Sequence, residues 1–176
     1  MRSLLLQALL RGRAVLQRPE DDPVMLDEAA QALAVSGRRR LGRSLAIREI
    51  DSGSCNGCEL EINALNNPVY DIERFGLKFV ASPRHADILL VTGPVTWNML
   101  EAVKRAYNAT PEPKWVIAAG DCAINCGVFA GSAACVGPVS SVIPVDLHVP
   151  GCPPEPIRIL QALLALVDGP EVACPK

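Results

Sequence analysis

Short apolar runs that alternate with helix-forming stretches constrain the fold of this 176-residue chain more than any other feature. From residue 44 onward, crossovers long enough to hold a helix separate these runs, which is typical of strands in a parallel sheet covered on both faces. Strands are expected at 44–50, 77–81, 86–93, 114–120 and 145–151, and helices at 59–65, 97–109 and 156–167. The pattern predicts an α/β domain with a flavodoxin-like, doubly wound parallel sheet.

The expected helix at 97–109 has the composition of a helix that covers a sheet. Thr96 is expected as its N-cap, because a threonine hydroxyl can accept a hydrogen bond from the first turn. Leu100 and Val103 can face the sheet, while Glu101 and Arg105 can face water.

The chain divides into three parts. Residues 1–43 are expected to form an N-terminal arm with short helices at 1–18 and 25–35. Residues 44–169 form the α/β domain, and residues 170–176 form a C-terminal tail. Two short amphipathic helices have no core of their own, so the arm either packs on the domain, frays in solution, or docks on a partner or a membrane face.

Charge and hydropathy exclude several classes of function. Residues 1–43 carry eight Arg and five acidic residues, a charge of +3, which leaves −5 for the rest of a chain whose total is −2. An arm so weakly basic, without interleaved aromatic residues, does not indicate nucleic-acid binding. No run of about 18 apolar residues spans a bilayer, and no secretion signal precedes the domain. We therefore expect a cytoplasmic protein.

Four of the seven cysteines follow predicted strands. Cys55 and Cys58 follow 44–50, Cys122 follows 114–120, and Cys152 follows 145–151. Because the carboxyl ends of parallel strands share one edge of the sheet, these four thiols should converge. Thiolates are the ligands of iron–sulfur clusters, and a C-x2-C pair with a later C-P is typical of such sites. Asn56-Gly57 supplies residues that tolerate the positive φ of a tight loop.

Other interpretations of the cysteines stay open. Four thiolates also suit structural zinc, although zinc sites usually use two close pairs. Buried free thiols are a second alternative, which the polar loop around the C-x2-C pair disfavours. Cys126 competes with Cys122 as third ligand, but it lies further from the strand end. Cys135 and Cys174 have no spacing that implicates them.

The segments that hold the cysteines carry a family resemblance. SGSCNGCELEI, YDIERFGLKFVASPRHADILLVTGPVT, PEPKWVIAAGDCA and IPVDLHVPGCPPEP resemble the small subunit of group 4, membrane-associated nickel–iron hydrogenases of the formate hydrogenlyase and hydrogenase-4 type. They are also similar to the 20 kDa, or B-type, iron–sulfur subunit of respiratory complex I. The resemblance covers about residues 44–167.

This resemblance implies an oxidoreductase subunit that holds one 4Fe–4S cluster through Cys55, Cys58, Cys122 and Cys152. It implies no catalytic residue in this chain, since the nickel–iron site belongs to a large subunit. The implied partners are that large subunit, a ferredoxin-like iron–sulfur subunit and membrane-arm subunits, which would hold the protein on the inner face of the cell membrane.

The first cysteine pair separates the branches of the family. Hydrogenases carry C-x2-C there, as this chain does, whereas complex I subunits carry two adjacent cysteines. The hydrogenase branch is therefore expected, with a complex I-like subunit that reduces quinone as the alternative. Cys126 stands where members of the family usually have Gly.

Two polar pairs complete the candidates. Glu59 and Glu61 open a helix, where acidic side chains are favourable, or they form a proton path at a subunit interface. Arg84 and His85 form a polar surface turn, or they lie near the large subunit and the cluster.

Overall fold

The structure, a computed structural model, describes residues 44–168 together with residues 28, 31, 32 and 35. These four arm residues are helical, in agreement with the helix expected at 25–35. The expected helix at 1–18 and the tail at 170–176 lie outside the described residues, so the boundaries of the arm and the tail stay predictions. Among the described residues, no helix combines the length and the apolar character needed to cross a bilayer.

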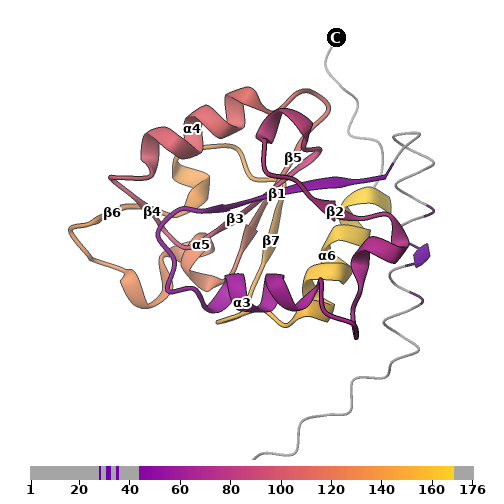
Figure 1. The fold of residues 1–176 in the computed structure, drawn as a ribbon. Coiled ribbons are helices and arrows are strands. Elements are labelled where there is room, and N and C mark those ends of the chain that lie inside the picture. The colour runs from indigo at the N-terminus through magenta and orange to yellow at the C-terminus, as the bar shows by residue number, and fades with distance from the viewer. Residues whose placement is uncertain (1–27, 29–30, 33–34, 36–43, 169–176) are drawn as a thin grey trace, which may run out of the picture.

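A five-stranded parallel sheet forms the centre of the domain (Figure 1). Its strands, in spatial order, are β2 (Lys78–Phe79), β1 (Ala46–Asp51), β3 (Ile88–Thr92), β5 (Trp115–Ala119) and β7 (Leu147–Val149). Counted within this sheet, the order is 2-1-3-4-5, which is the flavodoxin-like, doubly wound arrangement. The five strands expected from the sequence are confirmed, each somewhat shorter than its apolar run.

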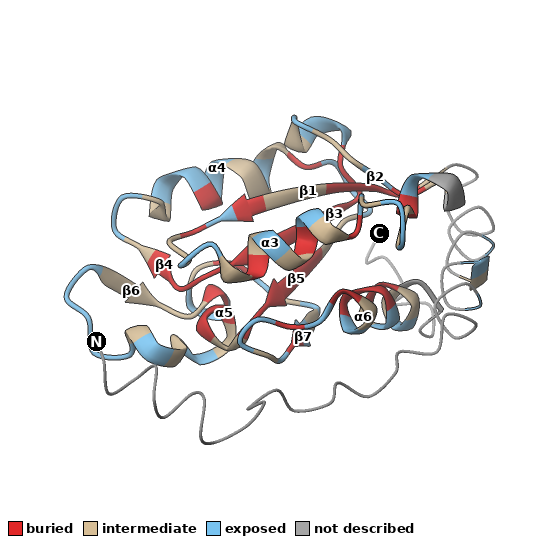
Figure 2. Ribbon diagram, turned by 60° about the horizontal axis from the view of Figure 1, so that its bottom comes forward, coloured by how far each residue is buried: buried red, intermediate tan, exposed pale blue. Residues whose placement is uncertain are grey.

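Helices cover both faces of the sheet. Helices α3 (Gly57–Ala64) and α6 (Pro156–Asp168) pack on one face, where Ile62 and Leu160 join Ile47 in one buried cluster. Helices α4 (Leu100–Ala109) and α5 (Asp121–Asn125) cover the other face, where Val103 packs with Leu89. Figure 2 shows the buried strands β3 and β5 between these layers. Burial on both faces explains the almost continuous apolar runs of the sequence.

Several shorter elements have no counterpart in the sequence prediction. A two-stranded antiparallel sheet pairs β4 (Val95–Thr96) with β6 (Cys135–Gly137). Short 3₁₀ helices lie at η1 (Ile72–Phe75), η2 (Pro83–His85), η3 (Gly127–Phe129) and η4 (Val139–Ser141). Elements of two to five residues are too short to produce a recognisable apolar period.

The N-cap expected at Thr96 is wrong. Helix α4 begins at Leu100 with Met99 as its N-cap, and Thr96 belongs to β4. The Thr96 hydroxyl donates a hydrogen bond to the carbonyl oxygen of Ser52 at 3.1 Å, so it ties β4 to the loop after β1. The expected helix start at residue 97 is three residues too early, whereas its end at 109 is confirmed, as are the burial of Val103 and the exposure of Glu101, which pairs with Arg105 in solvent.

Candidate iron–sulfur site

The loop between β1 and α3 carries the C-x2-C pair and is held by its own polar side chains. Asp51 Oδ1 accepts hydrogen bonds from the backbone N–H groups of Gly53 at 2.8 Å and Ser54 at 2.7 Å. Asn56 has a left-handed φ of 69°, as the Asn-Gly sequence predicts. Cys55 is exposed within this loop, whereas Cys58 lies buried in the first turn of α3.

The single cysteines follow β5 and β7. Cys122 is the second residue of α5 and is buried, and Cys152 follows β7 and is exposed. Figure 1 shows α5 and the amino-terminal end of α3 at the same end of the sheet, where the strands finish. The four cysteines therefore all stand at the carboxyl edge, as the sequence pattern predicts.

Cys58 packs closely against the end of β5. A Cβ atom added at Gly120 would lie 2.6 Å from Cys58 Sγ and 3.6 Å from the carbonyl oxygen of Gly151. Three loops therefore meet around the Cys58 sulfur, those after β1, β5 and β7. Gly120 has a φ of +91°, a conformation that L side chains rarely adopt, so the chain approaches the sulfur at a position that only glycine suits.

Electrostatics connect the four thiols. The pKa of Cys58 is raised to about 12, chiefly by burial and then by the charge of Glu59. Further increases come from the other three thiols, Cys122, Cys55 and Cys152. Burial also raises the pKa of Cys122. A hydrogen bond from the backbone N–H of Val128 acts in the opposite direction, because it stabilises the thiolate.

The donor set fits a cationic metal cluster. Negative charge on the other three thiols opposes negative charge on Cys58, and positive iron bound among them would compensate that repulsion. The backbone N–H of Val128, which donates to the Cys122 sulfur, is the type of donor that stabilises cluster sulfur. Among the residues that the structure describes, no three His, Cys, Asp or Glu side chains form a group that could hold a single metal ion.

Cys126 occupies a different environment from Cys122. It ends α5 with a left-handed φ of 69° and is half-buried. Burial and then the neighbouring Cys135 raise the pKa of Cys126. The pKa of Cys122, in contrast, responds to Cys152 and Cys55. The charges that act on each thiol therefore associate Cys122 with Cys152 and Cys55, and associate Cys126 with Cys135 in β6.

A polar contact beneath α3 was missed in the sequence. Thr92 Oγ1, at the end of β3, donates a hydrogen bond to Glu59 Oε1. The other carboxyl oxygen of Glu59 and one of Glu49 are buried without a hydrogen-bond partner in the described structure. Burial and then the charge of Glu59 raise the pKa of Glu49. Glu49 gave no sequence signal, because a lone glutamate in a strand usually faces solvent.

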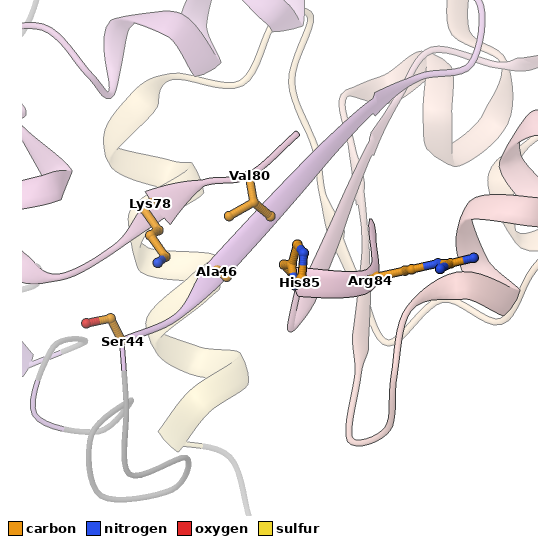
Figure 3. Close-up of a pocket in the computed structure, with 6 residues that line it drawn as sticks. All are labelled: Ser44, Ala46, Lys78, Val80, Arg84 and His85. Atoms are coloured by element: carbon orange, nitrogen blue, oxygen red, sulfur yellow. The ribbon is translucent and has the colours of Figure 1, made fainter. Parts of the chain in front are cut away.

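Arg84 and His85 lie away from the cysteines. Both belong to η2, which precedes β3 and therefore stands at the amino edge of the sheet, opposite the cysteine edge. They line an open pocket of about 470 Å³ with Ser44, Ala46, Lys78 and Val80 (Figure 3). The interpretation of this pair as a surface turn agrees with the structure, and the alternative position beside the cluster is wrong.

Comparison with known proteins agrees with this arrangement. The family model of the NADH ubiquinone oxidoreductase 20 Kd subunit matches residues 55–166. The probable membrane-bound hydrogenase subunit mbhJ of Pyrococcus furiosus is 53% identical over 128 residues, which cover 73% of this chain and 77% of that protein. Formate hydrogenlyase subunit 7 of Escherichia coli is 43% identical over 138 residues, covering 78% of this chain and 54% of the relative.

A solved structure shares the fold. A chain of the membrane-bound sulfane sulfur reductase, an archaeal respiratory membrane complex, aligns with a TM-score of 0.64 at 33% identity. The alignment covers 77% of this chain and 73% of that one. The shared fold and the family match over residues 55–166 both indicate the family from which the chain descends. The chain belongs to the NADH–ubiquinone oxidoreductase 20 kDa subunit family of oxidoreductase subunits, a family known for an iron–sulfur cluster.

Proposed function

We propose that this chain is the electron-transfer small subunit of a membrane-associated nickel–iron hydrogenase complex, and that it holds one 4Fe–4S cluster beside a catalytic large subunit. The proposal is supported by the position of four thiols, from three loops, at the carboxyl edge of the sheet. Cys55, Cys58, Cys122 and Cys152 would bind the cluster. When bound, the cluster supplies one-electron transfer between the large subunit and ferredoxin-like subunits.

The residues of this chain have distinct tasks in that proposal. Cys58 and Cys122 would anchor the cluster from the buried side, and Cys55 and Cys152 would close it from the solvent side. The N–H of Val128 would stabilise negative charge at the Cys122 sulfur. The neighbouring acidic groups would disfavour an added electron and so tend to lower the reduction potential.

The hydrogenase branch is favoured by the C-x2-C spacing of the first pair and by the identity of 53% to the Pyrococcus furiosus hydrogenase subunit. The alternative, a complex I-like subunit whose cluster reduces quinone, is supported by the family match itself. The two differ in the large subunit, which retains a nickel site only in the first.

An exposed apolar rim supports docking of a large subunit at the cysteine edge. We use this name for Leu60, Trp97 and Val128, which are 62%, 62% and 78% exposed. Leu60 follows Cys58 by two residues, and the N–H of Val128 contacts the Cys122 sulfur. Trp97 directly follows β4, which the Thr96 hydroxyl ties to Ser52 just beyond β1. Large exposed apolar side chains at one edge are typical of protein interfaces. The partner complex would in turn hold this subunit on the inner face of the cell membrane.

The ligand assignment is tested by anaerobic purification of the complex from Cys55→Ser and Cys152→Ser variants, with Cys126→Ser as the control. We expect iron, acid-labile sulfide and the electron paramagnetic resonance signal of this subunit's cluster to be lost in the first two variants and kept in the control. A full cluster signal in both variants would refute the assignment. Zinc in place of iron in the wild-type subunit would instead support a structural metal site.

The docking face is tested by Trp97→Ser, with Val69→Ser as a matched control. Val69 is 67% exposed but lies between α3 and η1, away from the cysteine edge. We expect the Trp97 variant to lose copurification with the large subunit and the Val69 variant to keep it. Nickel in the copurified large subunit, with hydrogen evolution, distinguishes a hydrogenase from a quinone reductase.

A further inference from the structure

The loops that carry Cys122 and Cys152 are joined just outside the sheet. The ladder between β5 and β7 ends with the N–H of Gly120 bonded to the carbonyl oxygen of Val149 at 2.8 Å. One residue further, the N–H of Asp121 donates to the carbonyl oxygen of Gly151 at 2.9 Å. The N–H of Gly151 donates in return to Asp121 Oδ1, also at 2.9 Å.

The return bond depends on the Asp121 side chain. Beyond the ends of the strands, the backbone supplies only one of the two bonds between residues 121 and 151, and the carboxylate accepts the other. Gly151 has a φ of +145°, and a Cβ there would lie 2.6 Å from Pro154 Cα, so the loop passes close to itself at a position that glycine suits. Asp121 and Gly151 directly precede Cys122 and Cys152, so this pair of bonds sets the spacing of the two cysteines.

The same carboxylate places a charge next to the site. Asp121 directly precedes Cys122, and its Oδ1 lies 2.9 Å from the N of Gly151, the residue before Cys152, so a charge on this carboxylate stands beside both cysteines. Asp51 accepts two backbone hydrogen bonds in the loop of the first cysteine pair, but both lie within that loop. In the described structure, only Asp121 joins one cysteine loop to another through a carboxylate.

We propose that Asp121 is a positioning residue of the metal site, which holds the Cys152 loop at a fixed distance from Cys122 and lowers the reduction potential of the bound cluster through its charge. The inference rests on the proposed function, since it needs a cluster at these cysteines. Asp121 would not bind the metal itself and would act through the proposed ligands Cys122 and Cys152.

Two substitutions separate the two roles. Asp121→Asn keeps an oxygen that can accept the Gly151 N–H and removes the charge, whereas Asp121→Ala removes both. Asp146→Asn is the control, because Asp146 Oδ2 likewise accepts a backbone N–H, that of Val116 at 2.7 Å, but at the amino end of β5. Each variant complex is purified anaerobically, its iron and sulfide are measured, and its cluster is titrated by electron paramagnetic resonance.

We expect the Asn variant at 121 to keep its iron and to be reduced more easily. A threefold to tenfold rise in the equilibrium constant for reduction is a shift of up to about 59 mV for one electron. We expect the Ala variant to lose at least half of its cluster, or to release iron to a chelator several-fold faster than wild type, and Asp146→Asn to match wild type.

Each result has a defined meaning. An unchanged potential in Asp121→Asn, with circular dichroism like that of wild type, would overturn the electrostatic role. Full and equally stable iron loading in Asp121→Ala would overturn the positioning role. Wild-type protein without an iron–sulfur signal would overturn the proposed function itself, and this inference with it.

Discussion

Replacement of Gly120 by alanine tests the packing of the site in depth. At a φ of +91°, an alanine is strained by about 1–3 kcal/mol, offset by about 0.4–1 kcal/mol from the smaller entropy of the unfolded chain. The new Cβ would also stand 2.6 Å from Cys58 Sγ, closer than any ordinary contact. The sulfur or the end of β5 must move, at a further cost of about 1–3 kcal/mol. We therefore expect Gly120→Ala to lower the free energy of unfolding by about 1–5.5 kcal/mol.

Gly131→Ala provides the matched control for that experiment. Gly131 also has a positive φ, +80°, but an added Cβ would meet nothing within 4 Å. It should therefore carry only the backbone strain less the entropy term, a net cost of about 0–2.5 kcal/mol, so Gly120→Ala should exceed it by the steric cost of about 1–3 kcal/mol. Anaerobic urea unfolding followed by circular dichroism gives both free energies, and iron analysis reports the cluster. Equal stability and equal iron content in the two variants would refute the contact between Cys58 and the end of β5.

Two further substitutions test buried polar groups. Burial raises the pKa of Glu49, so the folded state loses stability as the pH rises from the ordinary value of 4.5 through the folded pKa. The stability of Glu49→Gln relative to wild type should therefore increase across that window. Urea midpoints between about pH 5 and 8 measure this, and a pH-independent difference would contradict it. Lys114 Nζ lies 3.1 Å from the Tyr107 carbonyl oxygen and 4.0 Å from the centroid of the Tyr107 ring. Lys114→Met should therefore lower the free energy of unfolding by about 1–3 kcal/mol, and Lys104→Met, at an exposed position, by at most about 0.5 kcal/mol. Equal urea midpoints for the two variants would show that the Lys114 cation contributes nothing.

The parallel sheet and the edge that holds the cysteines were predictable because both depend on local chemistry. The first four residues of β3 (Ile88–Thr92) are all apolar because both faces of the strand are covered, and that burial is visible in the sequence. Once strands are assigned, parallel pairing brings their carboxyl ends together. The positions of Cys122 and Cys152 therefore followed without knowledge of any side-chain contact.

Features that depend on which loops meet were not predictable. Thr96 resembles an N-cap in the sequence, yet β4 pairs with a strand some forty residues later and draws Thr96 out of the helix. Glu59 was expected at a helix start, and it does lie in the first turn of α3, but its contact with Thr92 depends on how α3 packs over β3. The bond from Gly151 to Asp121 likewise joins residues that only the completed sheet brings together.

The unequal exposure of the four thiols has a consequence for assembly. Cys58 and Cys122 are buried by the folded sheet, whereas Cys55 and Cys152 remain open to solvent. A cluster bound there would have one wall made by this chain and one wall facing outward, so iron and sulfide can be delivered after the domain has folded. Docking of another subunit on the apolar rim would then seal the opening against dioxygen. In the proposed complex, cofactor delivery would accordingly precede subunit docking, and a subunit purified alone would need anaerobic handling to keep its metal.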